Sequence, residues 1–280
     1  MKRSSKNSNC KNIIVFRVSF LCFVVLVLSG SSAFALDPLG PPVTEIRKGQ
    51  IKAGIEYSLG SMDFELTNGM GFLKNLSIST DTIDVQSGGI ADLTVEDFES
   101  EKVNAYIGYG LEQNWEAYVR IGASNSELDT FESGYTPSIA GGLRITMIDD
   151  RKFKVGGAAQ IGWTKYGGEV TSPDWFSPGS VDIDIKEVQA TLGVLYKWTD
   201  YISVYGGPFY HYIFGEYNFN LTYVDNGIGY SKYTADIEAK SNLGGYVGTK
   251  IDIGKNIYLN CEYQLTADAD CLSAGLIFQF

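Results

Sequence analysis

Apolar and polar residues alternate along most of this 280-residue chain, and a period of two is typical of β-strands with two different faces. In residues 51 to 59 every second side chain is apolar, and those between are polar or glycine. Helical periodicity is nearly absent after residue 43. The pattern predicts an all-β protein with ten strands. They cover residues 49–60, 101–110, 114–123, 138–147, 152–163, 185–198, 201–214, 237–252, 257–265 and 271–280.

The predicted connections alternate between long and short. Long connections follow the odd-numbered strands, except that the connection after the ninth strand is short. Tight turns follow the even-numbered strands. Most predicted strands also reach the ~9 to 11 residues that a tilted strand needs to cross a bilayer. Long loops at one end and short turns at the other are typical of an antiparallel up-and-down transmembrane β-barrel. We therefore predict such a barrel over residues 49–280, with ten strands, and with eight strands as the alternative count.

A soluble β-sandwich or lipocalin-type barrel is the alternative fold, because its strands alternate in the same way with the apolar face inside. Two observations favour the transmembrane barrel. The polar face is rich in glycine, as at Gly108 and Gly248, which weakens a solvated strand but makes room inside a narrow barrel. Aromatic residues such as Trp115 and Trp198 gather near strand ends, as in the girdles of membrane barrels.

The N-terminal residues 1–35 have the features of a secretory signal peptide. They contain five basic and no acidic residues, an apolar run from Val18 to Leu28, and the small-residue site Ala33-Phe34-Ala35. We expect cleavage before Leu36, followed by a periplasmic N-terminal segment at residues 36–48. A retained membrane anchor is the alternative, although the apolar run is shorter than the ~20 residues that span a bilayer.

The last predicted strand ends on a C-terminal phenylalanine. Its apolar residues alternate with polar or small ones at Leu272, Ala274, Leu276, Phe278 and Phe280. This ending resembles the C-terminal assembly signal of bacterial outer-membrane proteins. Together with the signal peptide and the loop pattern, it makes residues 49–280 similar to the small OmpA-type or opacity-type (porin-like) barrels.

The resemblance implies a place in the cell envelope and a set of partners. It implies export to the outer membrane of a Gram-negative bacterium, surrounded by outer-membrane lipid and lipopolysaccharide. It also implies that the outer-membrane assembly machinery recognises Phe278 and Phe280. The periplasmic peptidoglycan-binding domain of the OmpA type is not expected, because the chain stops at Phe280.

The alternation assigns charged residues of both signs to the barrel interior. Because unpaired charges in a tight lumen would be costly, the expectation is that they cross-pair into a closed polar core. The alternative is a narrow pore that they line. The expected interior charges are Lys52, Glu56, Glu116, Arg120, Arg144, Lys154, Glu187, Lys197, Glu238, Lys240, Lys250, Asp252 and Glu262.

The net charge of the exported chain resides in its long loops. The five predicted loops hold 20 acidic and 3 basic residues, eight of the acidic ones within residues 61–100. An acidic surface argues against nucleic-acid binding, which needs basic groups against phosphates. The pairs Asp182/Asp184 and Asp268/Asp270 lack the glycine-centred spacing of a calcium loop, so no metal site and no cofactor are expected.

An enzymatic role is not expected. The single histidine, His211, lacks the aspartate two residues earlier that an omptin-like protease needs, because Phe209 stands there. A lipid A deacylase-like site would need serine at position 213, where Ile213 stands. We therefore expect a non-enzymatic outer-membrane barrel with a structural or surface-interaction role, in which the acidic loops bind an extracellular ligand. The alternative function is a narrow porin-like channel for ions or small solutes.

Two cysteines, Cys261 and Cys271, remain after signal cleavage and flank a short hairpin. The alternation places Cys261 on the outward face and Cys271 on the inward face. Directly paired residues of neighbouring strands share a face, so these two cannot form a disulfide. We predict two free thiols.

Overall fold

The computed structural model describes residues 36–76, 83–89, 93–128, 131–170, 179–224, 228–240 and 242–280. The signal peptide predicted at residues 1–35 lies outside them. All regular elements in the described part are β-strands. They are β1 (Ile51–Leu76), β2 (Ile83–Gly89), β3 (Leu93–Glu112), β4 (Trp115–Leu128), β5 (Phe131–Glu132), β6 (Thr136–Asp149), β7 (Phe153–Val170), β8 (Gly179–Lys197), β9 (Ile202–Val224), β10 (Ile228–Ala239), β11 (Leu243–Asp252), β12 (Ile257–Thr266) and β13 (Ala269–Gln279).

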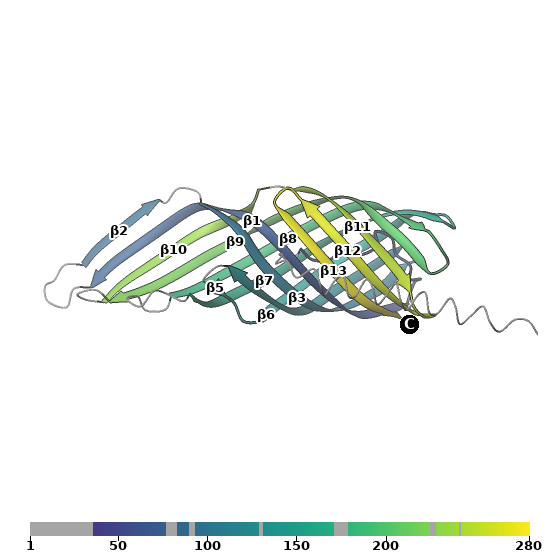
Figure 1. Ribbon diagram of the computed structural model, residues 1–280, viewed down its shortest axis with the longest axis horizontal. Helices are drawn as coiled ribbons and strands as arrows, with labels where there is room; N and C mark the ends of the chain where they lie inside the picture. Colours follow the sequence, from purple (N-terminus) through teal and green to yellow (C-terminus); the bar gives the residue numbers. More distant parts are fainter. Residues whose placement is uncertain are drawn as a thin grey trace, which may run out of the picture.

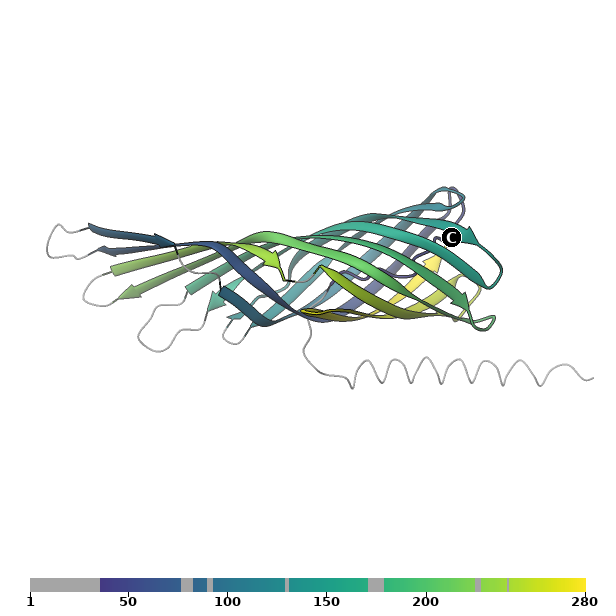
Figure 2. The ribbon, with the colours of Figure 1, turned by 90° about the horizontal axis from the view of Figure 1, so that it is seen from above.

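Ten of these strands close into an antiparallel ring. The order is β1, β3, β4, β6, β7, β8, β9, β11, β12 and β13, and β13 pairs with β1 to close it. Figures 1 and 2 show the strands tilted along an elongated barrel, with the short connections and the C-terminus at one end. We call this the turn end and the opposite end the loop end. The predicted ten-stranded barrel is therefore confirmed, and its architecture is that of an outer-membrane β-barrel.

In the part of the chain that the structure describes, no helix is long and apolar enough to span a bilayer.

The two faces of the barrel wall exchange character partway along the strands. On β1 the buried side chain changes from Glu56 to Phe64, whereas the outward side chain changes from Ile55 to Glu65. The turn-end half thus has an apolar exterior and a polar interior, and the loop-end half has the reverse. An apolar outer band around the wall is typical of outer-membrane barrels, so the inversion marks one edge of such a band. Large side chains of this band, 50% to 66% exposed, include Ile55, Ile107, Ile121, Ile161, Leu192 and Val247.

The ring narrows beyond this inversion. β11, β12 and β13 do not extend past the inversion. Beyond it, β10 lies between β9 and β1 in their place. The two-residue strand β5 likewise replaces β6 between β4 and β7. The loop-end half is therefore an eight-stranded ring with an apolar interior, which we call the upper barrel. A ring of this size is narrow enough for side chains to fill.

The observed strands are longer than the alternation predicted. β1 continues to Leu76 and β3 begins at Leu93, within the stretch 61–100 that was expected to be a loop. Sequence reasoning ended these strands where the outward face became polar, but the backbone pairing continues above the apolar band. The predicted strand 237–252 is also wrong, because β10 ends at Ala239 and β11 begins at Leu243.

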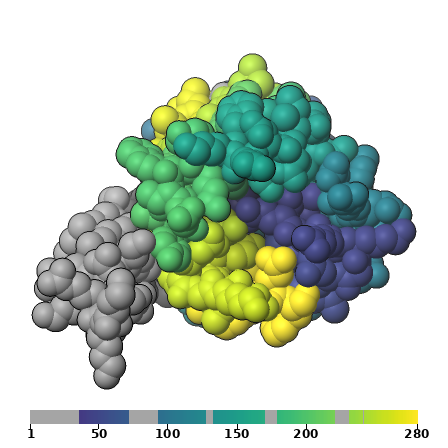
Figure 3. Space-filling model, turned by 90° about the vertical axis from the view of Figure 1, so that its right-hand side faces the viewer, coloured from purple at the N-terminus to yellow at the C-terminus, as the bar shows by residue number. Residues whose placement is uncertain are grey.

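Residues 36–46, which we call the luminal segment, run inside the barrel. Leu36, Leu39, Val43 and Ile46 are at most 3% exposed. In the view onto the turn end, purple N-terminal residues reach the middle of the ring of strands (Figure 3). The expectation of a periplasmic segment at residues 36–48 thus differs from the structure, in which only Arg47 and Lys48 are exposed at the turn end. Four apolar side chains spaced along a proline-rich stretch give this segment a surface to bury among the wall residues.

Glycines on the inner face were expected to make room for large charged neighbours, and in the structure several of them make room for tyrosines. A Cβ atom added at Gly248 would lie 2.3 Å from the Cζ of Tyr205, and one added at Gly142 would lie 2.6 Å from the Tyr118 ring. The rings of these inner tyrosines therefore fit only because the facing positions are glycine.

Candidate functional site

The lumen gathers most of the buried charged residues, in layers that we describe from the turn end outward. In the first layer Glu116 of β4 accepts bonds from two cations. Its Oε2 lies 3.1 Å from Nζ of Lys52, and its Oε1 lies 3.1 Å from Nη1 of Arg144. Tyr106 and Thr44 donate their hydroxyls to the same carboxylate. All the oxygen positions of this fully buried carboxylate are thus used, which offsets the cost of burying its charge.

The second layer is centred on Arg120 of β4, whose side chain is completely buried. Its guanidinium pairs with Glu56 through two nitrogens, and its Nη1 donates to Oε1 of Gln160 at 2.7 Å. The rings of Tyr106 and Tyr118 lie 5.3 and 4.9 Å from its Cζ. Arginine suits this position because its planar group can bind a carboxylate and contact aromatic rings together.

The third layer, nearest the inversion, contains three carboxylates. Lys102 of β3 lies 3.1 Å from Asp37 and 3.8 Å from Glu187. His211 of β9 lies 3.5 Å from the Glu187 carboxylate. Glu262 of β12 accepts the backbone N–H of Leu39 at 2.9 Å. This layer is richer in carboxylates than in cations.

The luminal segment is fixed by side chains from many strands. Arg144 donates to the carbonyl of Leu39 at 2.8 Å, and Gln264 donates to the carbonyl of Asp37 at 3.1 Å. Near the turn end, Lys250 pairs with Glu45. The segment has no strand partner of its own, so wall side chains satisfy its backbone groups in place of a sheet.

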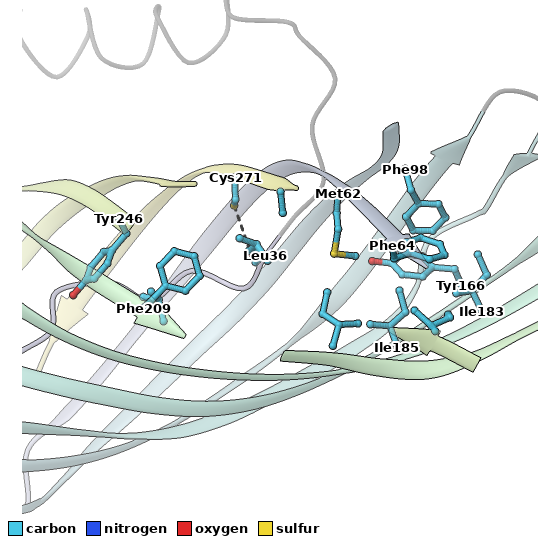
Figure 4. Close-up of a cluster of buried hydrophobic side chains, with 14 of the residues drawn as sticks. Leu36, Met62, Phe64, Phe98, Tyr166, Ile183, Ile185, Phe209, Tyr246 and Cys271 are labelled. Atoms are coloured by element: carbon cyan, nitrogen blue, oxygen red, sulfur yellow. Dashed lines mark hydrogen bonds between the residues drawn. The ribbon is translucent and has the colours of Figure 1, made fainter. Parts of the chain in front are cut away.

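Above the polar layers, apolar side chains fill the upper barrel. Phe64, Phe98 and Tyr166 contact one another edge to face, with ring centroids 5.4 and 5.5 Å apart. Figure 4 shows Leu36 between this group and a second one containing Phe209. The luminal segment and, farther out, the apolar core of the upper barrel therefore occupy the lumen.

A cavity opens near the turn end. It has a volume of about 370 Å³ and is lined by Glu45 and by residues of the turns. Its charged lining carries both signs, from Asp149, Asp150, Arg151, Lys152, Lys154, Lys197 and Asp252. Since Glu45 forms part of its wall, the luminal segment separates this cavity from the polar layers above.

The structure places the thirteen predicted interior charges in three groups. Eight are buried in the lumen, namely Lys52, Glu56, Glu116, Arg120, Arg144, Glu187, Lys250 and Glu262. Lys154 and Asp252 are half-buried at the turn end, and Lys197 is exposed there. Glu238 and Lys240 were wrongly assigned to the interior. Both are exposed, because residues 237–239 belong to β10, where Ile237 points inward.

Sequence reasoning missed three luminal residues. Asp37 and Glu45 lie on the luminal segment, which was expected outside the barrel. Lys102 lies on β3 and shares the inner face with Tyr106 and with Gly108, which the sequence had assigned to the polar face, but Lys102 was not included among the interior charges. The i, i+2 spacing from Lys102 through Asn104 to Tyr106 was the signal that could have found it.

No group of metal ligands or disulfide is found within the described ranges. No cluster of three or more metal-ligating side chains occurs there, and the Asp182/Asp184 pair faces outward beside Lys165, Lys186 and Trp163. Neither Cys261 nor Cys271 forms a disulfide, which confirms the prediction from the alternation. Cys271 is fully buried and its Sγ lies 3.3 Å from the carbonyl of Leu36, drawn as a dashed line in Figure 4.

The exterior of the upper barrel is acidic. Its outward positions alternate with the apolar core and place carboxylates on most of the wall strands. They are Asp63, Glu65, Glu99, Glu101, Glu127, Asp182, Asp184, Glu216, Asp236 and Glu238. Much of the acidity expected for flexible loops is therefore carried by regular strands.

Comparison with known proteins gives a likeness of fold only. No family model matches the sequence, and no curated protein matches it. Among solved structures, the translocator domain of autotransporter NalP from Neisseria meningitidis is 13% identical, covers 97% of each chain and has a TM-score of 0.41. The outer membrane protease OmpT from Escherichia coli is 11% identical, with 82% of this chain and 97% of that chain covered and a TM-score of 0.43. OprG from Pseudomonas aeruginosa is 10% identical over 84% and 97% of the two chains, with a TM-score of 0.41.

Proposed function

We propose that this chain is a non-enzymatic protein of the bacterial outer membrane, with a closed lumen and a structural or surface-interaction role through its acidic upper barrel. In this arrangement the apolar band of the turn-end half lies in the membrane. The turn end faces the periplasm, and the upper barrel projects from the cell. Outer-membrane lipid and lipopolysaccharide surround the band, and an extracellular ligand contacts the upper barrel.

The observation that carries this proposal is the filled lumen. The luminal segment is held at Lys102, Arg144 and Lys250, and a core of apolar side chains lies above it. An open pore for ions needs a continuous polar path, which these two layers interrupt. A rigid wall that extends beyond the membrane instead supports a surface role, because it holds carboxylates in fixed positions.

The absence of an enzymatic role is supported by the surroundings of His211. This side chain is 1% exposed and lies within the third polar layer. General acid-base catalysis needs a group that substrate can reach, with a positioned partner. Buried beneath the apolar core, His211 has the environment of a structural residue.

Single-channel recording in planar bilayers tests the proposal. The refolded protein is expected to give no steady open current in symmetric salt. Regular step-like currents would contradict the closed lumen and support the second candidate, a narrow porin-like channel. The observation that favours that candidate is the 370 Å³ cavity at the turn end, which would form the periplasmic mouth of such a channel.

Labelling of intact cells tests the orientation. A cysteine introduced at Asp182, on the exposed wall of the upper barrel, is expected to react with a membrane-impermeant maleimide on whole cells. The matched control is a cysteine at Lys152 in the turn-end cavity, which is expected to react only after the outer membrane is permeabilised. The reverse result would overturn the proposed orientation.

A further inference from the structure

The third polar layer has more negative than positive charge. Its carboxylates are Asp37, Glu187 and Glu262, all at most 7% exposed. Among the described residues, the ion pairs of Asp37 and Glu187 involve only Lys102 and His211, and Glu262 has no cation within 4 Å. Lys102 therefore faces Asp37 and Glu187, whereas Arg120 of the second layer acts on Glu262 from beyond 4 Å. Such an excess is costly in a dry lumen, and it is relieved either by protonation of a carboxylate or by a further cation.

The start of the luminal segment lies in this layer. The backbone nitrogen of Asp37 donates to Glu187 at 3.4 Å, and the nitrogen of Leu36 is one residue before it. Leu36 also lines a small cavity of about 20 Å³ together with Lys102, Glu187 and Thr164. This volume holds about one water molecule, which is enough for a single water to contact an ammonium group there. Cys271 fixes the position of Leu36 through its carbonyl.

We propose that signal cleavage before Leu36 supplies a further cation, and that the new α-ammonium group of Leu36 pairs with Glu187 inside the barrel. Cleavage hydrolyses the peptide bond after Ala35, and the freed amine takes up a proton from water. An α-amino group is normally protonated at neutral pH, and a carboxylate partner favours the charged form. Export processing thus becomes part of the folded core, since the new ammonium group reduces the excess of carboxylates over cations in the third layer from two to one.

The inference depends on cleavage before Leu36 and on a buried amine, and two measurements test these points. N-terminal sequencing of protein from purified outer membranes is expected to begin at Leu36. Folded protein is then treated with an amine-acetylating reagent, and the tryptic peptide 36–47 is analysed by mass spectrometry. Its amine is expected to be at least tenfold less reactive than in unfolded protein, whereas the exposed Lys48 reacts at similar rates in both. A different N-terminus, or an amine as reactive as in unfolded protein, would overturn the proposal.

A double-mutant cycle tests the ion pair itself. The two chains compared begin at Leu36 or carry one added glycine before it, which moves the ammonium by about 3.5 Å. Each is refolded with Glu187 or with Glu187→Gln, and unfolding by urea is measured in lipid. The substitution is expected to raise the unfolding equilibrium constant about tenfold more in the authentic chain than in the extended one. Equal effects in both chains would refute the pairing. Glu238→Gln on the exterior is the matched control and is expected to have no effect in either.

If Glu187→Gln fails to refold, the labelling result still decides whether the amine is buried. Failure of this inference also remains distinct from failure of the proposed function. A reactive N-terminus leaves the closed lumen and the conductance result unaffected.

Discussion

Nζ of Lys102 lies 3.1 Å from Oδ1 of Asp37, and this ion pair joins the third strand of the sheet to a segment that precedes the first. Both side chains are nearly inaccessible, with exposed fractions of 4% and 6%. The pair therefore ties the luminal segment to the wall at the level where the polar lumen meets the apolar core. Removal of the Lys102 side chain is therefore expected to lower the free energy of unfolding.

Lys102→Met is expected to destabilise the barrel by about 3 to 5 kcal/mol, because it leaves Asp37 and Glu187 buried without their lysine. Urea unfolding of the protein in lipid measures the loss. The matched control is Lys165→Met, whose side chain is 50% exposed and lies 3.9 Å from Asp182. An exposed pair of this kind contributes at most about 1 kcal/mol. Equal losses in the two variants would contradict the role of Lys102.

Two neighbouring glycines of β11 provide a test of inner-face packing. Gly248→Ala is expected to cost about 1 to 3 kcal/mol, because the added Cβ would overlap the Tyr205 ring at 2.3 Å. Gly245→Ala is expected to be neutral or slightly stabilising, since the nearest atom to its Cβ is a carbonyl oxygen at 3.9 Å. Urea unfolding of the two variants gives the comparison. A Gly248→Ala variant as stable as the parent would mean that Tyr205 can move aside.

The comparison of sequence with structure shows what alternation can and cannot predict. It assigned Glu116, Arg120 and Arg144 to the interior, because the period of two fixes which residues share a face. It ended β1 near residue 60, because the outward face becomes polar where the strand leaves the apolar band. The backbone pairing of β1 continues past this point, and only the polarity of its two faces changes.

The luminal segment was missed for a different reason. Residues such as Asp37 and Leu39 belong to a proline-rich stretch without periodicity, and nothing in such a stretch indicates whether it lies inside or outside a barrel. Its position depends on partners as distant as Glu262, more than two hundred residues away in the chain. Contacts of this kind are set by the closed ring and cannot be inferred from local pattern.

Deletion of residues 37–46 tests whether the luminal segment is the only closure. The deleted chain is expected to remain non-conducting, because Phe64, Phe98 and Ile237 still fill the upper barrel. It is also expected to unfold at lower urea concentration, since Lys102 loses Asp37 and Lys250 loses Glu45. Planar-bilayer recording and urea unfolding measure the two effects. Steady currents from the deletion alone would mean that the apolar core does not close the upper barrel.

The thiols of Cys261 and Cys271, which form no disulfide, are expected to differ in reactivity. Cys261 faces outward and is partly exposed, whereas Cys271 is completely buried and bonded to the Leu36 carbonyl. A small apolar maleimide should therefore modify Cys261 in the folded, detergent-bound protein and leave Cys271 unmodified. Unfolding without reductant should yield two adducts. Mass spectrometry gives both counts, and a single adduct or none after unfolding would contradict two free thiols.

The C-terminal phenylalanine is expected to act in assembly more than in folded stability. Its backbone closes the ring, because its N–H donates to the carbonyl of Ile51 at 2.8 Å, but its side chain is 70% exposed. Phe280→Ala keeps the backbone bond and removes only the side chain, which makes it a cleaner change than deletion. We expect a lower yield in the outer membrane of cells and little change in urea stability after refolding in vitro. Quantitative blotting of membrane fractions, with Leu276→Ala as the matched control on the same face, measures the first effect. An unchanged yield in cells would show that the resemblance of this ending to an assembly signal has no functional meaning, whereas a large loss of stability in vitro would assign the aromatic ring to packing instead.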